Sequence, residues 1–186
     1  MIEVEVKVAI NERDKEKIIK KLNTHGELLG VYNEEDTFFK SLHDPSYGRD
    51  KTLKLRRRDN EIKLIFKQKG ANGEFKENLE IEVKINEHDA NSVLRLLRYL
   101  GFEESIIIRK KRTAYRVNDC IVNLDDVENL GLFVEIEVLT DEYKRGEAHE
   151  KIEKVLSTLG ISGRELIRYS YVEMLKQRCK VKLRGF

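Results

Sequence analysis

The sequence predicts an α+β fold built around a mostly antiparallel β-sheet of about eight strands, and three observations indicate this class. Many segments alternate between charged and apolar residues with the period of two that is typical of strands. Short turn sequences such as Asn118-Asp119 join successive strands, which favours antiparallel hairpins. Helical patterns follow runs of several strands, whereas a parallel sheet needs a long crossover, usually a helix, between its strands.

The first half of the chain is expected to contain five strands and two helices. Residues 1–9 alternate strictly, and Asn11 then precedes a helical run that ends near Gly26. Proline and glycine indicate a loop at 41–50, and the sequence GANG marks a hairpin turn at 70–73. In order, the expected elements are a strand at 1–9, a helix after Asn11, strands at 28–40, 52–58, 61–69 and 74–85, and a helix at 89–100.

The second half is expected to contain three strands followed by two helices. Strands at 103–117 and 120–126 flank the Asn118-Asp119 turn, and a short turn at 127–131 leads to a strand at 132–139. Gly160 and Gly163 separate the two helices, since glycine commonly ends a helix. These helices are expected at 142–159 and 164–177. No linker composition divides the chain, so we expect one domain at 1–176 and a C-terminal tail at 177–186.

The composition limits the classes of protein to which the chain can belong. Its 186 residues are 40% hydrophobic, which is enough for a core and excludes a wholly disordered chain. Another 38% are charged, but 36 Lys and Arg residues nearly balance 34 Asp and Glu residues, so the net charge is +2. A chain without a large positive excess is a poor candidate for binding duplex DNA through many phosphate contacts. We therefore expect no nucleic-acid partner.

Cysteine usage and hydropathy favour a cytoplasmic location. Cys120 and Cys179 lie far apart and outside any Cys/His cluster, so we expect two reduced thiols and neither a zinc site nor a disulfide. The N-terminal segment is charged from Glu3 onward, unlike a signal peptide. No apolar run approaches the ~20 residues of a membrane span, so we expect no membrane partner.

The charged residues are sorted onto one face of nearly every expected strand. Lys54 and Arg56 share one face of their strand, while Glu135 and Glu137 share one face of another. An open sheet would place these faces in water, whereas closure of about eight strands would turn them inward around a tunnel. The period of two does not distinguish these arrangements. Carboxylates beside a basic wall would suit a divalent metal and a polyphosphate.

Eight segments in a fixed order carry a resemblance to a known family. They are Glu3-x-Glu5-x-Lys7, EEDTFF (34–39), LKLRRR (53–58), IFK (65–67), LEIEV (79–83), RKKRTAY (109–115), LDDVENLGLFVEIE (124–137) and SYVEML (170–175). This set resembles the CYTH superfamily of triphosphate tunnel metalloenzymes. The segment at 124–137 is the most specific, and in this long form the chain most resembles the class IV adenylyl cyclases.

The resemblance implies a closed antiparallel barrel of about eight strands, with helices on the outside, and it implies a set of site residues. Mg²⁺ or Mn²⁺ would be held by Glu3, Glu5, Asp126, Glu135 and Glu137. The triphosphate would be bound by Lys7, Lys54, Arg56, Lys67, Lys76, Lys110 and Arg112, of which Lys7, Arg56 and Arg112 would also be catalytic. Further tunnel residues would be Arg58, Lys63, Glu80 and Glu82.

The sequence departs from the family pattern at two of the basic positions. Lys54 stands where arginine is commoner, which removes a bidentate donor, and Asn78 stands where arginine often precedes the paired glutamates. Lys76 shares a strand face with Asn78 and is expected to supply the missing cation. These departures bear on the preferred ligand more than on the fold.

The implied function is a metal-dependent reaction of a triphosphate, most of all the conversion of ATP to cyclic AMP and pyrophosphate by an adenylyl cyclase. A triphosphatase acting on a thiamine, nucleoside or inorganic triphosphate would use the same metals and cations. A non-catalytic binder of polyphosphate is a third reading, but its site would have no need of the carboxylates. A homodimer is compatible with the sequence, which does not decide the oligomeric state.

Overall fold

The centre of the molecule is a closed barrel of eight antiparallel strands in the order β1-β5-β4-β3-β2-β6-β7-β8. The structure is a computed structural model that describes residues 2–70 and 75–183. Its strands are β1 (Ile2–Ile10), β2 (Glu27–Ser41), β3 (Lys51–Arg58), β4 (Glu61–Lys69), β5 (Lys76–Ile85), β6 (Phe102–Val117), β7 (Cys120–Val127) and β8 (Gly131–Thr140). Its α-helices are α1 (Glu12–His25), α2 (Ala90–Tyr99), α3 (Arg145–Leu159) and α4 (Tyr171–Leu183).

The barrel closes where the first strand pairs with the last. Strand β1 runs antiparallel to β8 from the pair Ile2 and Thr140 to the pair Ile10 and Leu132, and its other edge pairs with β5. The predicted closed barrel of eight strands is therefore confirmed, and the open amphipathic sheet is excluded. Most expected strand bounds agree to within a few residues, although the turn at 71–73 lies outside the described residues.

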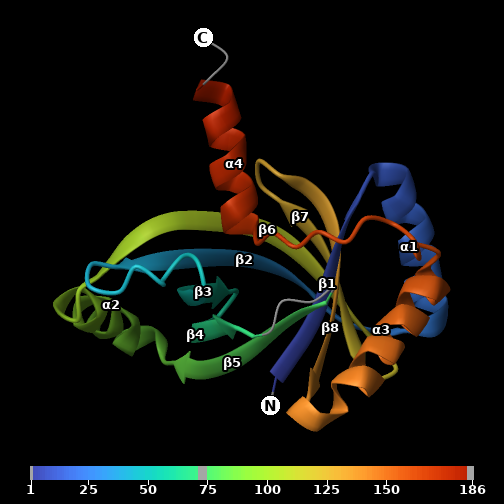
Figure 1. Ribbon diagram of the computed structural model, residues 1–186, viewed down its shortest axis with the longest axis horizontal. Coiled ribbons are helices and arrows are strands. Elements are labelled where there is room, and N and C mark those ends of the chain that lie inside the picture. The colour runs from blue at the N-terminus through green and yellow to red at the C-terminus, as the bar shows by residue number, and fades with distance from the viewer. Residues whose placement is uncertain (1, 71–74, 184–186) are drawn as a thin grey trace.

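The hydrophobic core lies outside the barrel, between the sheet and the helices. The apolar face of β1 packs with Ile18 and Leu22 of α1 and with Ile152 of α3 in one buried cluster. Helix α2 covers β3 and β4 through a second cluster that includes Leu55 and Leu97. Figure 1 shows α1 and α3 on one side of the barrel and α2 at the other end. Because the apolar faces point outward, the charged faces of the strands point inward.

Capping residues set the limits of the outer helices. The Asn11 side chain accepts a hydrogen bond from the Asp14 amide, and the Asp14 carboxylate accepts one from the Asn11 amide, so α1 begins with a capping box. Gly160 ends α3 with a left-handed φ of 73°, a conformation that glycine adopts at little steric cost. Both signals are visible in the sequence.

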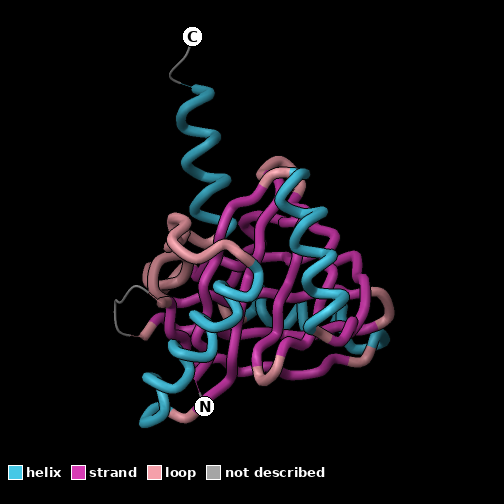
Figure 2. Tube along the Cα trace, turned by 90° about the vertical axis from the view of Figure 1, so that its right-hand side faces the viewer, coloured by secondary structure: helices cyan, strands magenta, loops and turns pink. Residues whose placement is uncertain are grey.

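The C-terminal helix differs from the one expected at 164–177. Residues 162–170 are not helical, and the amide of Ile167 donates to the carbonyl of Lys7 at 2.7 Å, which fixes this segment against β1. The Ser170 amide donates to Glu173 at 2.7 Å, and the Glu173 amide donates to the Ser170 hydroxyl at 3.2 Å. This capping box begins α4 at Tyr171. Helix α4 continues to Leu183 and points away from the barrel in Figures 1 and 2.

Within the described residues, none of the helices is both long enough and apolar enough to span a bilayer.

Candidate active site

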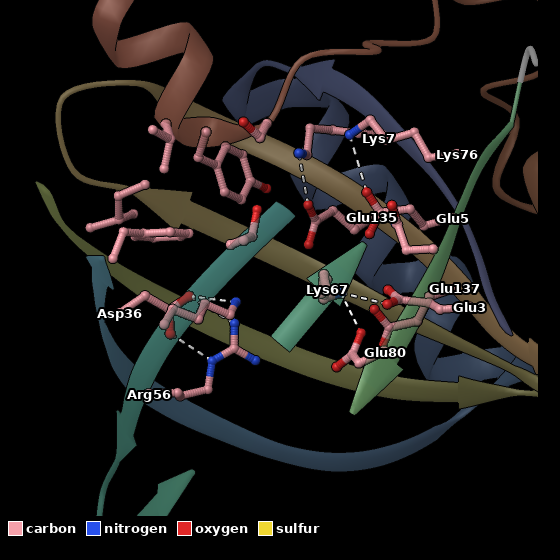
Figure 3. Close-up of a pocket in the computed structure, with 18 of the residues that line it drawn as sticks. Glu3, Glu5, Lys7, Asp36, Arg56, Lys67, Lys76, Glu80, Glu135 and Glu137 are labelled. Atoms are coloured by element: carbon pink, nitrogen blue, oxygen red, sulfur yellow. Dashed lines mark hydrogen bonds and ion pairs between the residues drawn. The ribbon is translucent and has the colours of Figure 1, made fainter. Parts of the chain in front are cut away.

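The inward faces of the strands enclose a cavity of about 940 Å³, which the first turn of α4 also lines. Figure 3 shows carboxylates and cations from many strands pointing into it. Of the sixteen residues that the sequence analysis assigned to the site, fifteen line this cavity: Glu3, Glu5, Lys7, Lys54, Arg56, Arg58, Lys63, Lys67, Lys76, Glu80, Glu82, Lys110, Arg112, Glu135 and Glu137. Only Asp126 is absent from its wall.

Three of the predicted metal ligands form one acidic cluster. Glu3 and Glu5 of β1 and Glu137 of β8 each offer a carboxylate oxygen, and these oxygens lie within 4.8 Å of one another. Glu3 Oε1 is buried without a hydrogen-bond partner. Burial raises the pKa of Glu3 well above its usual value, and the nearby Glu5 and Glu137 raise it further. Burial likewise raises the pKa of Glu137.

This acidic cluster has the chemistry of a divalent-cation site. A divalent cation would satisfy the unpartnered oxygen of Glu3 and would counter the raised pKa values of Glu3 and Glu137, and hard cations such as Mg²⁺ and Mn²⁺ prefer carboxylate oxygens. Glu3, Glu5 and Glu137 therefore fit the ion that the sequence implied. Glu5 is the most readily ionised of the three, because Lys76 and Lys67 outweigh burial and lower its pKa to about 2.

Glu135, the fourth glutamate expected to bind metal, is paired with cations instead. It lies 3.0 Å from Lys7 Nζ and also contacts the Arg112 guanidinium. These cations outweigh burial and hold the pKa of Glu135 well below its usual value. Lys7 and Arg112, both expected to be catalytic, are thus fixed from β1 and β6 by one carboxylate on β8.

The expectation that Asp126 joins the site is corrected by the orientation of β7. Asp126 is exposed on the outer face, so its carboxylate does not reach the cavity. Its neighbour Asp125 is 1% exposed and faces inward, where both its oxygens accept hydrogen bonds from Arg112 at 2.6 and 2.7 Å. Adjacent residues on a strand point to opposite faces of the sheet, so Asp125 points into the barrel and Asp126 points out of it.

A second missed carboxylate, Asp36, organises the basic wall. Arg56 donates to both of its oxygens at 2.7 and 2.8 Å, and Lys54 donates at 3.0 Å, so three charges on β2 and β3 form one compact group. Burial, followed by the proximity of Arg56, lowers the pKa of Lys54 to about 8. Asp36 belongs to the EEDTFF segment that the family resemblance includes, and in the structure it lies opposite Arg56 in the register of β2 and β3.

Glu34, two positions before Asp36 on the same inward face, connects the basic wall to β6. It accepts a hydrogen bond from Arg58 at 2.6 Å and lies 3.2 Å from Lys110 Nζ. Lys110 also lies 3.4 Å from Asp125. Because these cations outweigh burial, the pKa of Glu34 is strongly lowered.

The remaining cations are held by the carboxylates that would bind metal or by their neighbours. Lys67 contacts both Glu3 and Glu80, and Lys76 lies 3.1 Å from Glu5. A cation bound to Glu3 and Glu5 would neutralise these carboxylates and free the two lysines for phosphate oxygens. Lys76 and Asn78, which were expected to share one strand face, both line the cavity.

Helix α4 contributes a tyrosine that is not among the expected site residues. The Tyr171 hydroxyl donates to Asp125 at 3.0 Å, and Lys7 Nζ lies 3.9 Å from the centre of its ring. Tyr171 also packs with Ile108, Phe133 and Val172 in a buried cluster at this end of the barrel. The first turn of α4 therefore orients two charged groups of the cavity.

Comparison with known proteins gives one family and several similar structures. The family model named CYTH domain matches residues 1–171 of the sequence. A protein of Methanocaldococcus jannaschii named "Putative adenylate cyclase" is 34% identical over 94% of this chain and 98% of its own length. A Pyrococcus horikoshii structure, the PH1819 protein, is 34% identical, covers 95% of this chain and 99% of its own, and superposes with a TM-score of 0.83.

A more distant structure shares the fold alone. It is a Hippeastrum protein whose structure covers 95% of each chain with a TM-score of 0.70 at 18% identity. It is described as an adenylyl cyclase candidate with a dominant triphosphatase activity. At this identity the similarity supports the barrel architecture and does not transfer an activity.

Proposed function

The chain belongs to the CYTH domain family, and from this membership and the cavity we propose that it is a metal-dependent adenylyl cyclase that converts ATP to cyclic AMP and pyrophosphate. One observation carries the proposal: the acidic cluster and the basic wall line one closed cavity. A polyphosphate with a divalent cation matches both charge patterns at once. A protein that only bound polyphosphate would have no use for Glu3, Glu5 and Glu137.

In the proposed reaction Glu3, Glu5 and Glu137 hold Mg²⁺ or Mn²⁺. When bound, such an ion would lower the pKa of the ribose 3′-hydroxyl that attacks the α-phosphorus. Lys54, Lys67, Lys76 and Lys110 bind the phosphate oxygens as point charges, and their carboxylate partners keep them in place before the substrate arrives.

Arg56 and Arg112 have the geometry to stabilise charge that develops during the reaction. Each donates two hydrogen bonds to a buried aspartate, so each guanidinium is fixed in the cavity and its remaining donors are already oriented. Such preorganised donors stabilise negative charge on the α-phosphate and on the leaving pyrophosphate without reorganising at the moment of reaction. Lys7, fixed by Glu135, adds a third cation to this wall.

A triphosphatase is the second candidate, because the same residues would also support attack by water on the γ-phosphorus. The activity described for the Hippeastrum structure favours keeping this alternative, although that protein shares only the fold with this chain. The two reactions differ in which phosphorus faces the nucleophile. They therefore differ in their products.

The test is an assay with ATP and Mn²⁺ or Mg²⁺ in which cyclic AMP, pyrophosphate and inorganic phosphate are all quantified. Equal amounts of cyclic AMP and pyrophosphate are expected. Release of inorganic phosphate without cyclic AMP would replace the cyclase with the triphosphatase. If no product forms although ATP binds in a metal-dependent way, the protein is a polyphosphate binder. Sedimentation of the same sample would test the homodimer that the sequence left open.

A further inference from the structure

The second half of β5 lacks a neighbouring strand on one side. Strand β1 pairs with β5 only from Lys76 to Leu79, whereas β4 pairs with the other side of β5 as far as Ile85. Among residues 2–70 and 75–183, no strand other than β4 pairs with residues 80–85. These residues, called the free edge below, lie at the lower margin of the molecule in Figure 1. Their unpaired backbone groups are a template on which another strand can pair.

The outer face of β5 along the free edge is apolar and exposed. Leu79, Ile81 and Val83 are 43%, 52% and 51% exposed, and they form one row because alternate residues of a strand share a face. The helices cover only the two ends of this row. Ile85 packs in the cluster beneath α2, and Glu77 forms an ion pair with α3. A row of exposed apolar side chains on an unpaired edge indicates a surface that associates with another chain.

The sequence of the free edge limits how two copies of this chain could pair there. Two identical strands related by a two-fold axis run antiparallel, with one residue opposite its own copy. With Glu80, Glu82 or Lys84 at that position, two like charges would face each other, which is unfavourable. With Ile81 there, Glu80 would face the partner's Glu82, again a pair of like charges. Of residues 80–84, only Val83 places no like charges opposite each other.

The pairing about Val83 also matches the other residues of the free edge. Ile81 would lie opposite the partner's Ile85, and Glu82 would lie opposite the partner's Lys84, each contact occurring twice by symmetry. Opposite residues of an antiparallel pair point to the same face, so the apolar contacts stay outside and the ion pairs stay on the cavity side. The side chains of Glu82 and Lys84 are 38% and 76% exposed. Each already contacts β4, but a carboxylate and an ammonium can both hold a second partner.

We propose that two copies of this chain associate through the free edge, with their β5 strands antiparallel and paired about Val83. The sheets of the two barrels then form one continuous sheet, and the row of exposed apolar side chains gains contacts across the two-fold axis. Because Glu82 lines the cavity, the partner's Lys84 would add a cation at the wall of each cavity. The inference is independent of the proposed reaction, and its tests need no substrate.

Cross-linking of single cysteines tests the register. All variants carry Cys179→Ser, and Cys120 is fully buried. Oxidation of Val83→Cys should give a disulfide-linked dimer on a non-reducing gel, because opposite Cα atoms lie about 5 Å apart. Glu82→Cys and Lys84→Cys should cross-link when mixed and far less when oxidised separately. Two copies of either residue would be displaced by two positions, and their Cα atoms would lie more than about 7 Å apart.

Val31→Cys is the matched control for cross-linking. Val31 is also 51% exposed, but it lies on β2 beside a bulge between Leu28 and Gly30, and a bulge disrupts strand pairing. This variant should give no linked dimer under the same conditions. The inference is overturned if Val83→Cys links no more than Val31→Cys. It is also overturned if the two cysteines at 82 and 84 link no better when mixed than when apart.

Sedimentation equilibrium tests the association without introduced cysteines. The wild type should sediment as a dimer that dissociates on dilution. Val83→Lys should raise the Kd of the dimer by about tenfold or more, because two lysines would face each other at the two-fold axis. Val31→Lys should dimerise like the wild type. A wild type that stays monomeric at every concentration, or a dimer that Val83→Lys leaves unchanged, would overturn the inference.

Discussion

Lys7 Nζ lies 3.0 Å from Glu135 Oε1, although 128 positions separate the two residues in the chain. They face each other on β1 and β8, the two strands that close the barrel, and their side chains are 3% and 9% exposed. A buried ion pair requires both partners, since one charge left alone costs several kcal/mol. The pairing of β1 with β8, which closes the barrel, therefore also brings these two charged side chains together in the cavity.

Removing one fixed guanidinium should slow turnover far more than removing a surface charge. Arg56→Ala is expected to lower kcat by about 10²–10³, the usual effect of losing one preorganised charge-stabilising group. Lys20→Ala, on the exposed face of α1, should leave kcat unchanged. Initial rates with ATP, measured below the melting temperature of both variants, check this. Similar losses in the two variants would contradict a catalytic role for the inward face.

The neighbouring aspartates of β7 allow the loss of an inward and of an outward carboxylate to be compared by their effects on the free energy of unfolding. Asp125→Ala should destabilise the protein by about 3–5 kcal/mol, because Arg112 would lose its bidentate partner inside the barrel. Asp126→Ala removes an exposed carboxylate and should change the free energy of unfolding by less than ~0.5 kcal/mol. Denaturant titration of both variants measures the difference. Comparable losses of unfolding free energy in the two variants would contradict the placement of Asp125 inside the barrel and Asp126 outside it.

The strands and their faces could be predicted from the sequence, whereas barrel closure could not be derived from the period of two. An open sheet and a closed barrel have the same alternation of side chains, and only the family resemblance favoured closure. The pairing of Lys7 with Glu135 depends on a register between distant strands, which no local pattern contains. The fold class was thus predictable from local signals, and the convergence of the charges was not.

Two local patterns in the sequence indicate the features at which the structure departs from expectation. Val122 and Leu124 alternate with Asn123 and Asp125, so the apolar pair facing the helices indicates that Asp125 points into the barrel. The family resemblance points to Asp126 instead. Likewise, Ser170-x-x-Glu173 is a capping box, which would have placed the start of the last helix at Tyr171.

Binding of triphosphate should depend on the ionisation of Lys54. Its pKa of about 8 means that the ammonium is charged below pH 8 and becomes neutral as the pH rises above it. Affinity for inorganic triphosphate should therefore fall as the pH rises through about 8. Lys54→Arg keeps its charge to much higher pH, so its affinity should fall less across the same range. Parallel pH titrations of binding at constant ionic strength would reveal the divergence, and coincident curves would contradict it.

Metal and triphosphate together should stabilise the fold more than either alone. The cavity is lined by carboxylates and cations from seven of the eight strands, and a bound metal with a polyphosphate would supply counter-charges to both sets. A ligand that binds only the folded state at a hundredfold excess over Kd adds about 2.7 kcal/mol. For a domain of this size, that corresponds to a rise in Tm of about 5–10 °C. A thermal-shift series with ATP, inorganic triphosphate and AMP, each with Mn²⁺ and with chelator, measures the effect.

The Glu137→Gln variant, measured in the same thermal-shift series, tests whether the metal binds at the acidic cluster. The variant removes a carboxylate whose pKa burial raises, so without metal it should melt no lower than the wild type. It should nevertheless lose most of the extra shift that Mn²⁺ gives with ATP, because the acidic cluster is reduced to Glu3 and Glu5. AMP should give a far smaller shift, since it cannot reach across the basic wall. A full Mn²⁺-dependent shift in Glu137→Gln would place the metal elsewhere, and equal shifts with AMP and ATP would argue against a triphosphate site.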